Sequence, residues 1–149
     1  MLRTAITAPS NPFILRYTVP AEDIDEQGRA NNVAYIRWMN IVAVAHSNAL
    51  GFPWERFVEM GSMFVVRRHE IDYRLPAFEG DVLELRTWPL MMRAATAHRG
   101  HEIARAKDGV VIASGMNVWG YVDMKTGKPV RMPPEVLEAF DPAKYIYLP

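Results

Sequence analysis

Hydrophobic and polar positions alternate early in the chain, and this alternation predicts its first element. From Phe13 to Val19 every second residue is aliphatic or aromatic, which is typical of a half-buried strand, and Pro20 ends the pattern. Residues 1–12 contain two prolines and no periodic pattern, so they are expected to form a loose lead-in. Residues 21–30 are rich in acids and are expected to form a turn.

The segment 33–50 is the most apolar part of the chain, and Arg37 is its single fully charged residue. Apolar residues occupy nearly every face of the helix that this segment predicts, so the helix is expected to be buried. Asn31 or Asn32 is expected to begin it, because an asparagine side chain can accept hydrogen bonds from free helix amides. Gly51 is expected to end it.

The remainder of the chain is typical of a sheet with short connections. Runs rich in β-branched and aromatic residues predict four strands, at 63–75, 82–90, 95–106 and 110–124. The separators are PAFEGD, MMRA and KDG, and the last of these favours a hairpin. Two short helices are expected, at 53–60 and at 133–140, where a proline opens the second.

Short connections favour antiparallel pairing, because parallel strands need long crossovers. The sequence therefore predicts an α+β fold in which about five antiparallel strands wrap around one long central helix. A length of 149 residues is typical of one domain, so 1–149 is expected to be a single domain. Residues 133–149 would form its C-terminal short helix and tail.

Composition and charge narrow the class of function. The chain has 17 basic and 17 acidic residues, and this balance argues against a nucleic-acid partner, which needs a clustered basic surface. With no cysteine, four scattered histidines and no nucleotide-binding loop, we expect no disulfide, no metal site and no cofactor. No run is typical of a signal peptide or a membrane span, so we expect a cytoplasmic protein without membrane contact.

Four local motifs, in order along residues 13–134, resemble one known family. They are Asp25-Glu26-Gln27-Gly28 with Tyr35 ten residues after the aspartate, Asn31 to Ile36, Tyr73 to Ala77 with Gly80-Asp81, and Thr126 to Pro129 with Pro133. Together they are similar to the hotdog-fold thioesterases, in particular the 4-hydroxybenzoyl-CoA thioesterase-like family of acyl-CoA hydrolases. The resemblance implies a hotdog fold and a homodimer or dimer of dimers. It also implies a thioester hydrolase that releases free acid and CoA from an acyl-CoA.

The same resemblance implies a catalytic set of Asp25, Asn32 and Tyr35. The physical chemistry of the segment agrees with it, because the start of a buried helix offers free amides and the positive end of the helix dipole. Such donors stabilise a developing oxyanion, and a carboxylate just before them can act as general base or nucleophile. An acidic turn in front of an apolar helix therefore brings both groups to one point.

Candidate substrate-binding residues follow from the same pattern. Gly28 would allow close approach of the backbone to the substrate, and Asn32 or Asn31 could orient water. Arg29 could contact a phosphate or an acidic acyl group. In this family the site lies between two subunits, so Arg67 and His69 are candidates to line the acyl pocket across the interface.

Other charged residues are expected to be ordinary surface groups. Three acids of the turn, Glu22, Asp23 and Glu26, are assigned to solvent. Four cations are candidates for CoA phosphates by charge alone, although each is more typical of a solvated side chain: Arg93, Arg99, Arg105 and Lys107. His46 is expected to be a packed or hydrogen-bonded core group.

Two alternative functions stay open. A non-catalytic acyl-thioester-binding protein is one, because Arg29 and Asn40 stand where relatives carry histidine and glutamate. A thioester hydratase or dehydratase is the other, but such enzymes pair an acid with a histidine, and no Asp-x4-His spacing follows Asp25.

Overall fold

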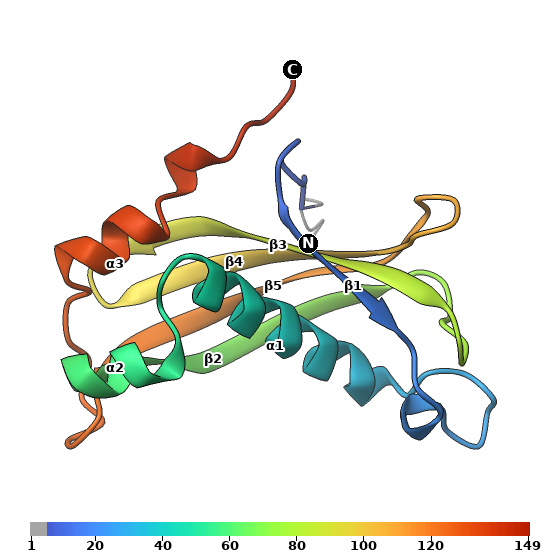
Figure 1. Ribbon diagram of the computed structural model, residues 1–149, viewed down its shortest axis with the longest axis horizontal. Helices are drawn as coiled ribbons and strands as arrows, with labels where there is room; N and C mark the ends of the chain where they lie inside the picture. The colour runs from blue at the N-terminus through green and yellow to red at the C-terminus, as the bar shows by residue number, and fades with distance from the viewer. Residues whose placement is uncertain (1–5) are drawn as a thin grey trace, which may run out of the picture.

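Five antiparallel strands form one sheet, and one long helix lies across a face of it (Figure 1). The computed structural model describes residues 6–149. In chain order its elements are β1 (Phe13–Thr18), η1 (Ala21–Asp23), α1 (Asn32–Ala49), α2 (Trp54–Met60), β2 (Ser62–Tyr73), β3 (Val82–Arg93), β4 (Thr96–Arg105), β5 (Val111–Asp123), α3 (Pro134–Ala139) and η2 (Pro142–Lys144). The strand order is β1-β3-β4-β5-β2, and every neighbouring pair is antiparallel. The predicted α+β architecture is confirmed.

The core lies between α1 and the facing side of the sheet. Trp38 and Val42 of α1 pack against a cluster that includes Leu83 and Leu85 of β3 and Ile103 of β4, and all are fully buried. Burying side chains of this kind stabilises the fold by about 1.5–3 kcal/mol each. This packing fixes the direction of α1 across the sheet, so its first turn points at the segment 21–30 (Figure 1).

Both ends of α1 are where the sequence predicts them. Asn31 is the N-cap, and its side-chain oxygen accepts a hydrogen bond of 2.8 Å from the amide of Val33. At the other end Gly51 has a φ of +87°, and its amide donates to the Asn48 carbonyl at 3.0 Å. This left-handed residue closes the helix, which is why a glycine stands there.

The expectation that α1 is buried on nearly every face is wrong for the single chain. Val33 and Val44 are 58% and 59% exposed, because the sheet covers one side of the helix only. None of the helices within residues 6–149 is long and apolar enough to span a membrane.

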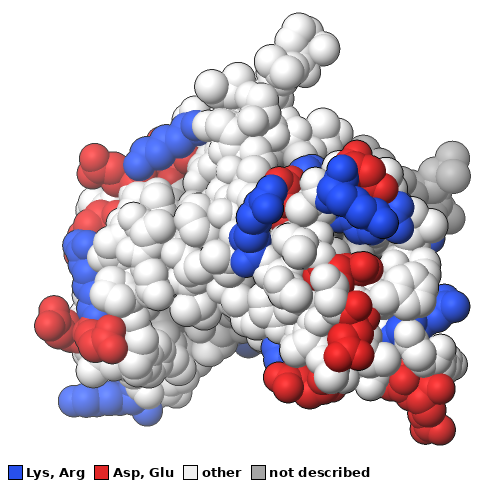
Figure 2. Space-filling view, turned by 45° about the vertical axis from the view of Figure 1, so that its right-hand side comes forward, with Lys and Arg blue, Asp and Glu red and all other residues white. Residues whose placement is uncertain are grey.

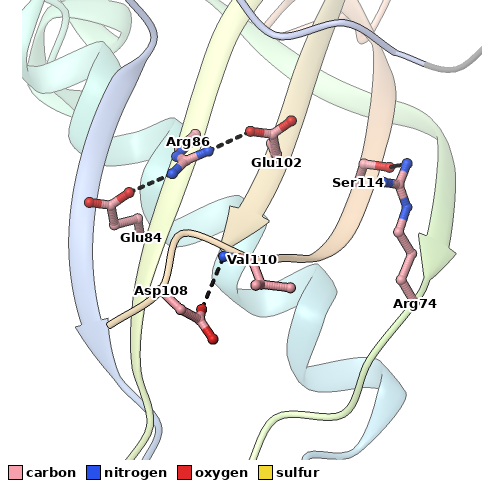
Figure 3. Close-up of polar contacts among 7 residues, drawn as sticks. All are labelled: Arg74, Glu84, Arg86, Glu102, Asp108, Val110 and Ser114. Carbon is pink, nitrogen blue, oxygen red and sulfur yellow. Dashed lines mark hydrogen bonds and ion pairs between the residues drawn. The ribbon is translucent and has the colours of Figure 1, made fainter. Parts of the chain in front are cut away.

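The turn between β4 and β5 lies where the sequence predicts it, whereas the turn between β3 and β4 does not. The predicted turn at 107–109 is present, with Gly109 at a φ of +72° and Asp108 Oδ1 accepting from the Val110 amide at 3.0 Å (Figure 3). The predicted separator 91–94, in contrast, is mostly strand. β3 continues through Arg93, and the turn falls on Ala94 and the residue after it. Strand pairing with β4 overrides the local signal there.

The outer face of the sheet is polar. Arg86 of β3 lies between Glu84 and Glu102, with nitrogen to oxygen distances of 2.6 Å to each carboxylate (Figure 3). Charged side chains of both signs are interspersed on the face drawn in Figure 2, beside a broad uncharged area.

The two terminal segments are hydrogen-bonded to one another. Residues 6–12 form no helix or strand, as expected, while residues 1–5 of the predicted lead-in lie outside the described part of the chain. The segment is not loose, however. The Ser10 amide donates to the Ile146 carbonyl at 2.6 Å, and Asn11 Nδ2 donates to the Lys144 carbonyl at 3.0 Å.

Candidate active site

An open pocket of about 390 Å³ lies where the turn before α1 meets the end of β2. Four of the predicted site residues line it, namely Asp25, Arg29, Asn32 and Tyr35. Tyr73 and Arg74 line the opposite side, and Arg74 donates from Nη2 to Ser114 Oγ at 3.0 Å (Figure 3). The structure therefore brings together half of the candidate site residues that the sequence predicts.

The turn fixes the carboxylate of Asp25 at the edge of this pocket. Its Oδ1 accepts a hydrogen bond of 2.8 Å from the amide of Gln27. The Gly28 amide donates to the Asp25 carbonyl, and the Asp25 amide donates to the Arg29 carbonyl, both at 3.0 Å. Asp25 Oδ2 accepts no hydrogen bond from the described residues. One oxygen thus holds the orientation while the other stays available.

Gly28 has a conformational role in this turn. Its φ is +80°, and a Cβ placed on it would meet no atom within 4 Å. It is also not among the residues that line the pocket. The glycine is required because L side chains rarely adopt such a φ, and close contact between its backbone and a substrate stays a prediction.

One amide at the start of α1 is free to donate. The Val33 amide is bonded to the Asn31 side chain, and the Ala34 amide donates to the Asn31 carbonyl at 2.9 Å. Within residues 6–149 the Asn32 amide has no acceptor. Since Asn31 is used as the helix cap, the free donor and the exposed side chain both belong to Asn32.

Two tyrosines form the wall between the turn and β2. Tyr35 is buried, and its ring centroid lies 4.6 Å from Trp38 and 5.0 Å from Tyr73. Burial raises the pKa of Tyr35, so its hydroxyl stays protonated at neutral pH. Tyr73 donates from Oη to the Asn32 carbonyl at 2.9 Å. The motif that contains Tyr73 was visible in the sequence, but this contact joins residues 41 positions apart and depends on the fold.

Arg67 and His69 do not line this pocket. Both lie on β2, an edge strand of the sheet. The Arg67 guanidinium packs over Gly120, where a Cβ would come within 2.5 Å of Nε, and His69 Nδ1 lies 3.0 Å from Asn117 Nδ2. A role for either residue across a subunit interface stays a prediction.

The assignment of Asp23 to solvent is wrong. Only 2% of this residue is exposed, whereas Glu22 and Glu26 are exposed as expected. Asp23 Oδ2 accepts hydrogen bonds from Trp38 Nε1 at 2.8 Å and from Tyr17 Oη at 3.3 Å, and Oδ1 forms an ion pair with Arg37. Its position in an acidic turn concealed this role, because the donors belong to the preceding strand and the following helix and not to the turn itself.

We expect Asp23→Ala to destabilise the fold rather than to act as a mild surface change. Loss of the carboxylate leaves the buried Trp38 Nε1 without an acceptor, and the free energy of unfolding should fall by about 2–3 kcal/mol. Urea denaturation measures this. Glu22→Ala, at an exposed position of the same turn, is the matched control and should change stability by less than about 0.5 kcal/mol. Equal effects of the two substitutions would contradict the role of Asp23.

A second polar cluster lies beneath the C-terminal half of α1. Arg99 of β4 is buried, and its Nη1 lies 3.0 Å from both His46 Nδ1 and Thr87 Oγ1. A guanidinium can only donate, so His46 Nδ1 accepts and Nε2 carries the proton. Nε2 then donates to Tyr145 Oη at 2.8 Å. His46 is the hydrogen-bonded core group that was expected, but Arg99 is not a solvated phosphate candidate.

His101 and Asn117 extend this buried polar region along the sheet. His101 Nε2 lies 2.6 Å from Asn117 Oδ1, which accepts the hydrogen bond, while His101 Nδ1 is buried without a partner among the described residues. Burial, reinforced by the charge of Arg99, lowers the pKa of His101 to about 3, and the same two causes lower the pKa of His46 to about 3. Both histidines are therefore neutral in the folded protein at neutral pH.

These two histidines predict acid-sensitive stability. Their folded-state pKa values lie below the unfolded value near ~6.5, so protons bind preferentially to the unfolded chain. The stability that the two neutral histidines contribute is fully present above pH ~6.5 and is lost as the pH falls from there towards 3. His101→Gln removes one titrating group, so the decline in unfolding free energy between pH 6.5 and 4 should be shallower than in the wild type. Identical slopes in urea denaturation across this range would contradict the assignment.

Within residues 6–149, no group of three or more His, Asp or Glu side chains is placed to hold a metal ion.

Comparisons with known proteins bear on the family and on the fold of the chain. Residues 19–140 match the family described as the thioesterase-like superfamily. A relative from Aquifex aeolicus, named "Putative esterase", is 27% identical over 127 residues, covering 85% of this chain and 96% of that protein. The solved structure of a hypothetical protein from Aquifex aeolicus is 25% identical, with a TM-score of 0.81, and covers 87% of this chain and 100% of that one.

A solved 1,4-dihydroxy-2-naphthoyl-CoA thioesterase from Synechocystis has the same fold. Its TM-score is 0.80 at 16% identity, and the match covers 87% of this chain and 96% of that one. The predicted hotdog fold is confirmed.

Proposed function

Since the chain belongs to the thioesterase-like superfamily, we propose that it hydrolyses the thioester bond of an acyl-CoA to free acid and CoA. The observation that carries this proposal is the placement of the Asp25 carboxylate in one pocket with Asn32, whose amide is free at the start of α1. These are the two groups that acyl transfer needs on opposite sides of a carbonyl. The naphthoyl-CoA thioesterase of the same fold supports CoA as the carrier.

In the proposed reaction, the thioester oxygen accepts a hydrogen bond from the Asn32 amide at the positive end of the α1 dipole. A donor of this kind stabilises the developing oxyanion by about 3 kcal/mol. Asp25 Oδ2 takes a proton from a water that attacks the carbonyl carbon, or attacks that carbon itself to form an anhydride that water then cleaves. In either course the carbon to sulfur bond breaks, and CoA leaves as a thiolate that is then protonated.

The other pocket residues have supporting roles in this proposal. Tyr35 is buried and forms a rigid wall behind the carbonyl, held between Trp38 and Tyr73. Asn31 caps α1 and so keeps its first turn in place, which positions the Asn32 amide. Arg29 is exposed at the rim of the pocket and is placed to meet an anionic part of the substrate.

We expect Asp25→Asn to lower turnover ~10²–10⁴-fold, because an amide keeps the shape of the carboxylate but neither abstracts a proton nor attacks a carbonyl. Substrate affinity should change little, since the other walls of the pocket remain. A thiol-release assay over aromatic, short-chain, long-chain and hydroxylated acyl-CoAs measures both quantities.

Glu26→Gln is the matched control, because this neighbouring acid is exposed and does not line the pocket. It should reduce turnover by less than about threefold, since surface changes away from the reacting groups have small effects. The proposal fails if Asp25→Asn retains wild-type turnover on the best substrate. If no acyl-CoA is hydrolysed by the wild type although acyl-CoAs bind, the non-catalytic alternative replaces it.

We further propose a homodimer or dimer of dimers. The edge strand β2 and the exposed apolar side chains Val33 and Val66 support this, because unpaired strand edges and apolar surface favour association. Light scattering at micromolar concentration should give two or four times the single-chain mass of 17.0 kDa. A mass near that of one chain would contradict the dimer and with it any role of Arg67 or His69 across an interface.

A further inference from the structure

A second pocket, of about 170 Å³, lies between the C-terminal half of α1 and the end of the sheet that α2 and α3 cover. Its walls are mostly apolar and include Ala43, Phe57, Phe64, Trp119 and Phe140. It shares no lining residue with the pocket beside Asp25. Val44 and Trp54 line it as well and are themselves well exposed, so the pocket is open to solvent on their side.

One wall of this apolar pocket carries a buried positive charge. Arg99 lines the pocket, and its Cζ lies 5.9 Å from the centroid of the Phe140 ring. Its hydrogen-bond partners, His46 and Thr87, are both neutral. Among residues 6–149, no carboxylate forms an ion pair with it. Burial lowers the pKa of Arg99 to about 10, so the side chain is still a cation at neutral pH.

A cation in this position is costly unless an anion accompanies it. Both of these hydrogen bonds use a single nitrogen of Arg99, Nη1. Nε and Nη2 of Arg99 make no hydrogen bond with the described residues, and neither is completely enclosed by protein. These two nitrogens form the planar fork that pairs with both oxygens of a carboxylate.

We propose that this pocket binds a compact organic monocarboxylate, with its carboxylate on Arg99 and its apolar body among the aromatic side chains. The cavity volume sets the size of that body, because a cavity of about 150 Å³ accepts one benzene ring. A benzoate, a phenylacetate or a short alkanoate fits this limit. The aromatic walls and the cation together select an acid over a neutral molecule of the same shape.

This site is distinct from the pocket beside Asp25 within one chain. Arg99 contacts His46, which lies fourteen positions after Asn32 on the same helix and therefore about 21 Å from it. The inference does not rest on the proposed hydrolysis. The acids that such a reaction releases nevertheless belong to the same chemical class, so the site is suited to sense a product or another free acid of similar size.

Isothermal titration of the full-length protein with matched pairs of ligands tests the proposal. The acids are benzoate, phenylacetate and hexanoate, and the neutral partners are benzamide, phenylacetamide and hexanamide. We expect each acid to bind at least about tenfold more tightly than its amide, since hydrogen bonds to charged groups are the stronger ones. Equal affinity within the pairs, or no binding of any acid up to its solubility limit, overturns the proposal.

Three variants locate the binding. Arg99→Gln should abolish the preference for acids, and a retained preference in the folded variant overturns the proposal. Ala43→Phe fills the pocket from α1 without changing the cation and should prevent acids and amides alike from binding. If Arg99→Gln does not fold, Ala43→Phe decides, because unchanged acid binding in it also overturns the proposal. Asp25→Asn should bind the acids as the wild type does, which separates this site from the proposed hydrolysis.

Discussion

The packing of α1 on one face of the sheet positions both pockets of this protein, because each pocket is formed by one half of the same helix. Trp38 lies at the middle of that contact and is completely buried. Its indole nitrogen donates to Asp23, which also binds Tyr17 of β1 and Arg37. The carboxylate thereby ties the turn before the helix to the helix itself. The free amide of Asn32 and the available oxygen of Asp25 depend on this connection for their relative position.

Much of the fold was predictable, because short-range sequence patterns determine where many of its helices and strands begin and end. The alternation from Phe13, the cap at Asn31 and the glycine at Gly51 each act over a few residues, and the structure confirms all three. The continuation of β3 through Arg93 was missed, because it depends on pairing with β4 and not on the local sequence. Such pairing decides strand length more strongly than propensity does.

The candidate site was predictable only in part, for a similar reason. Asp25, Asn32 and Tyr35 lie close in sequence, so one turn and one helix bring them together. The buried state of Asp23 depends on Tyr17 and Trp38, and the cluster around Arg99 joins β3, β4, α1 and the C-terminal segment. From the sequence alone, a charged residue within a predicted strand cannot be recognised as one that is buried among neutral hydrogen-bond partners. Only the three-dimensional arrangement separates Arg99 from the solvated arginines.

The C-terminal segment has a consequence for the order in which the protein folds during synthesis. His46 receives its second hydrogen-bond partner from Tyr145, which leaves the ribosome 99 residues later, and Asn11 waits still longer for Lys144. β1 likewise has no neighbour until β3 is made, since Phe13 pairs with Thr87. Contacts this distant in sequence form slowly. The nascent chain therefore exposes its most apolar helix until β3 and β4, which supply the core residues that pack against it, have been made.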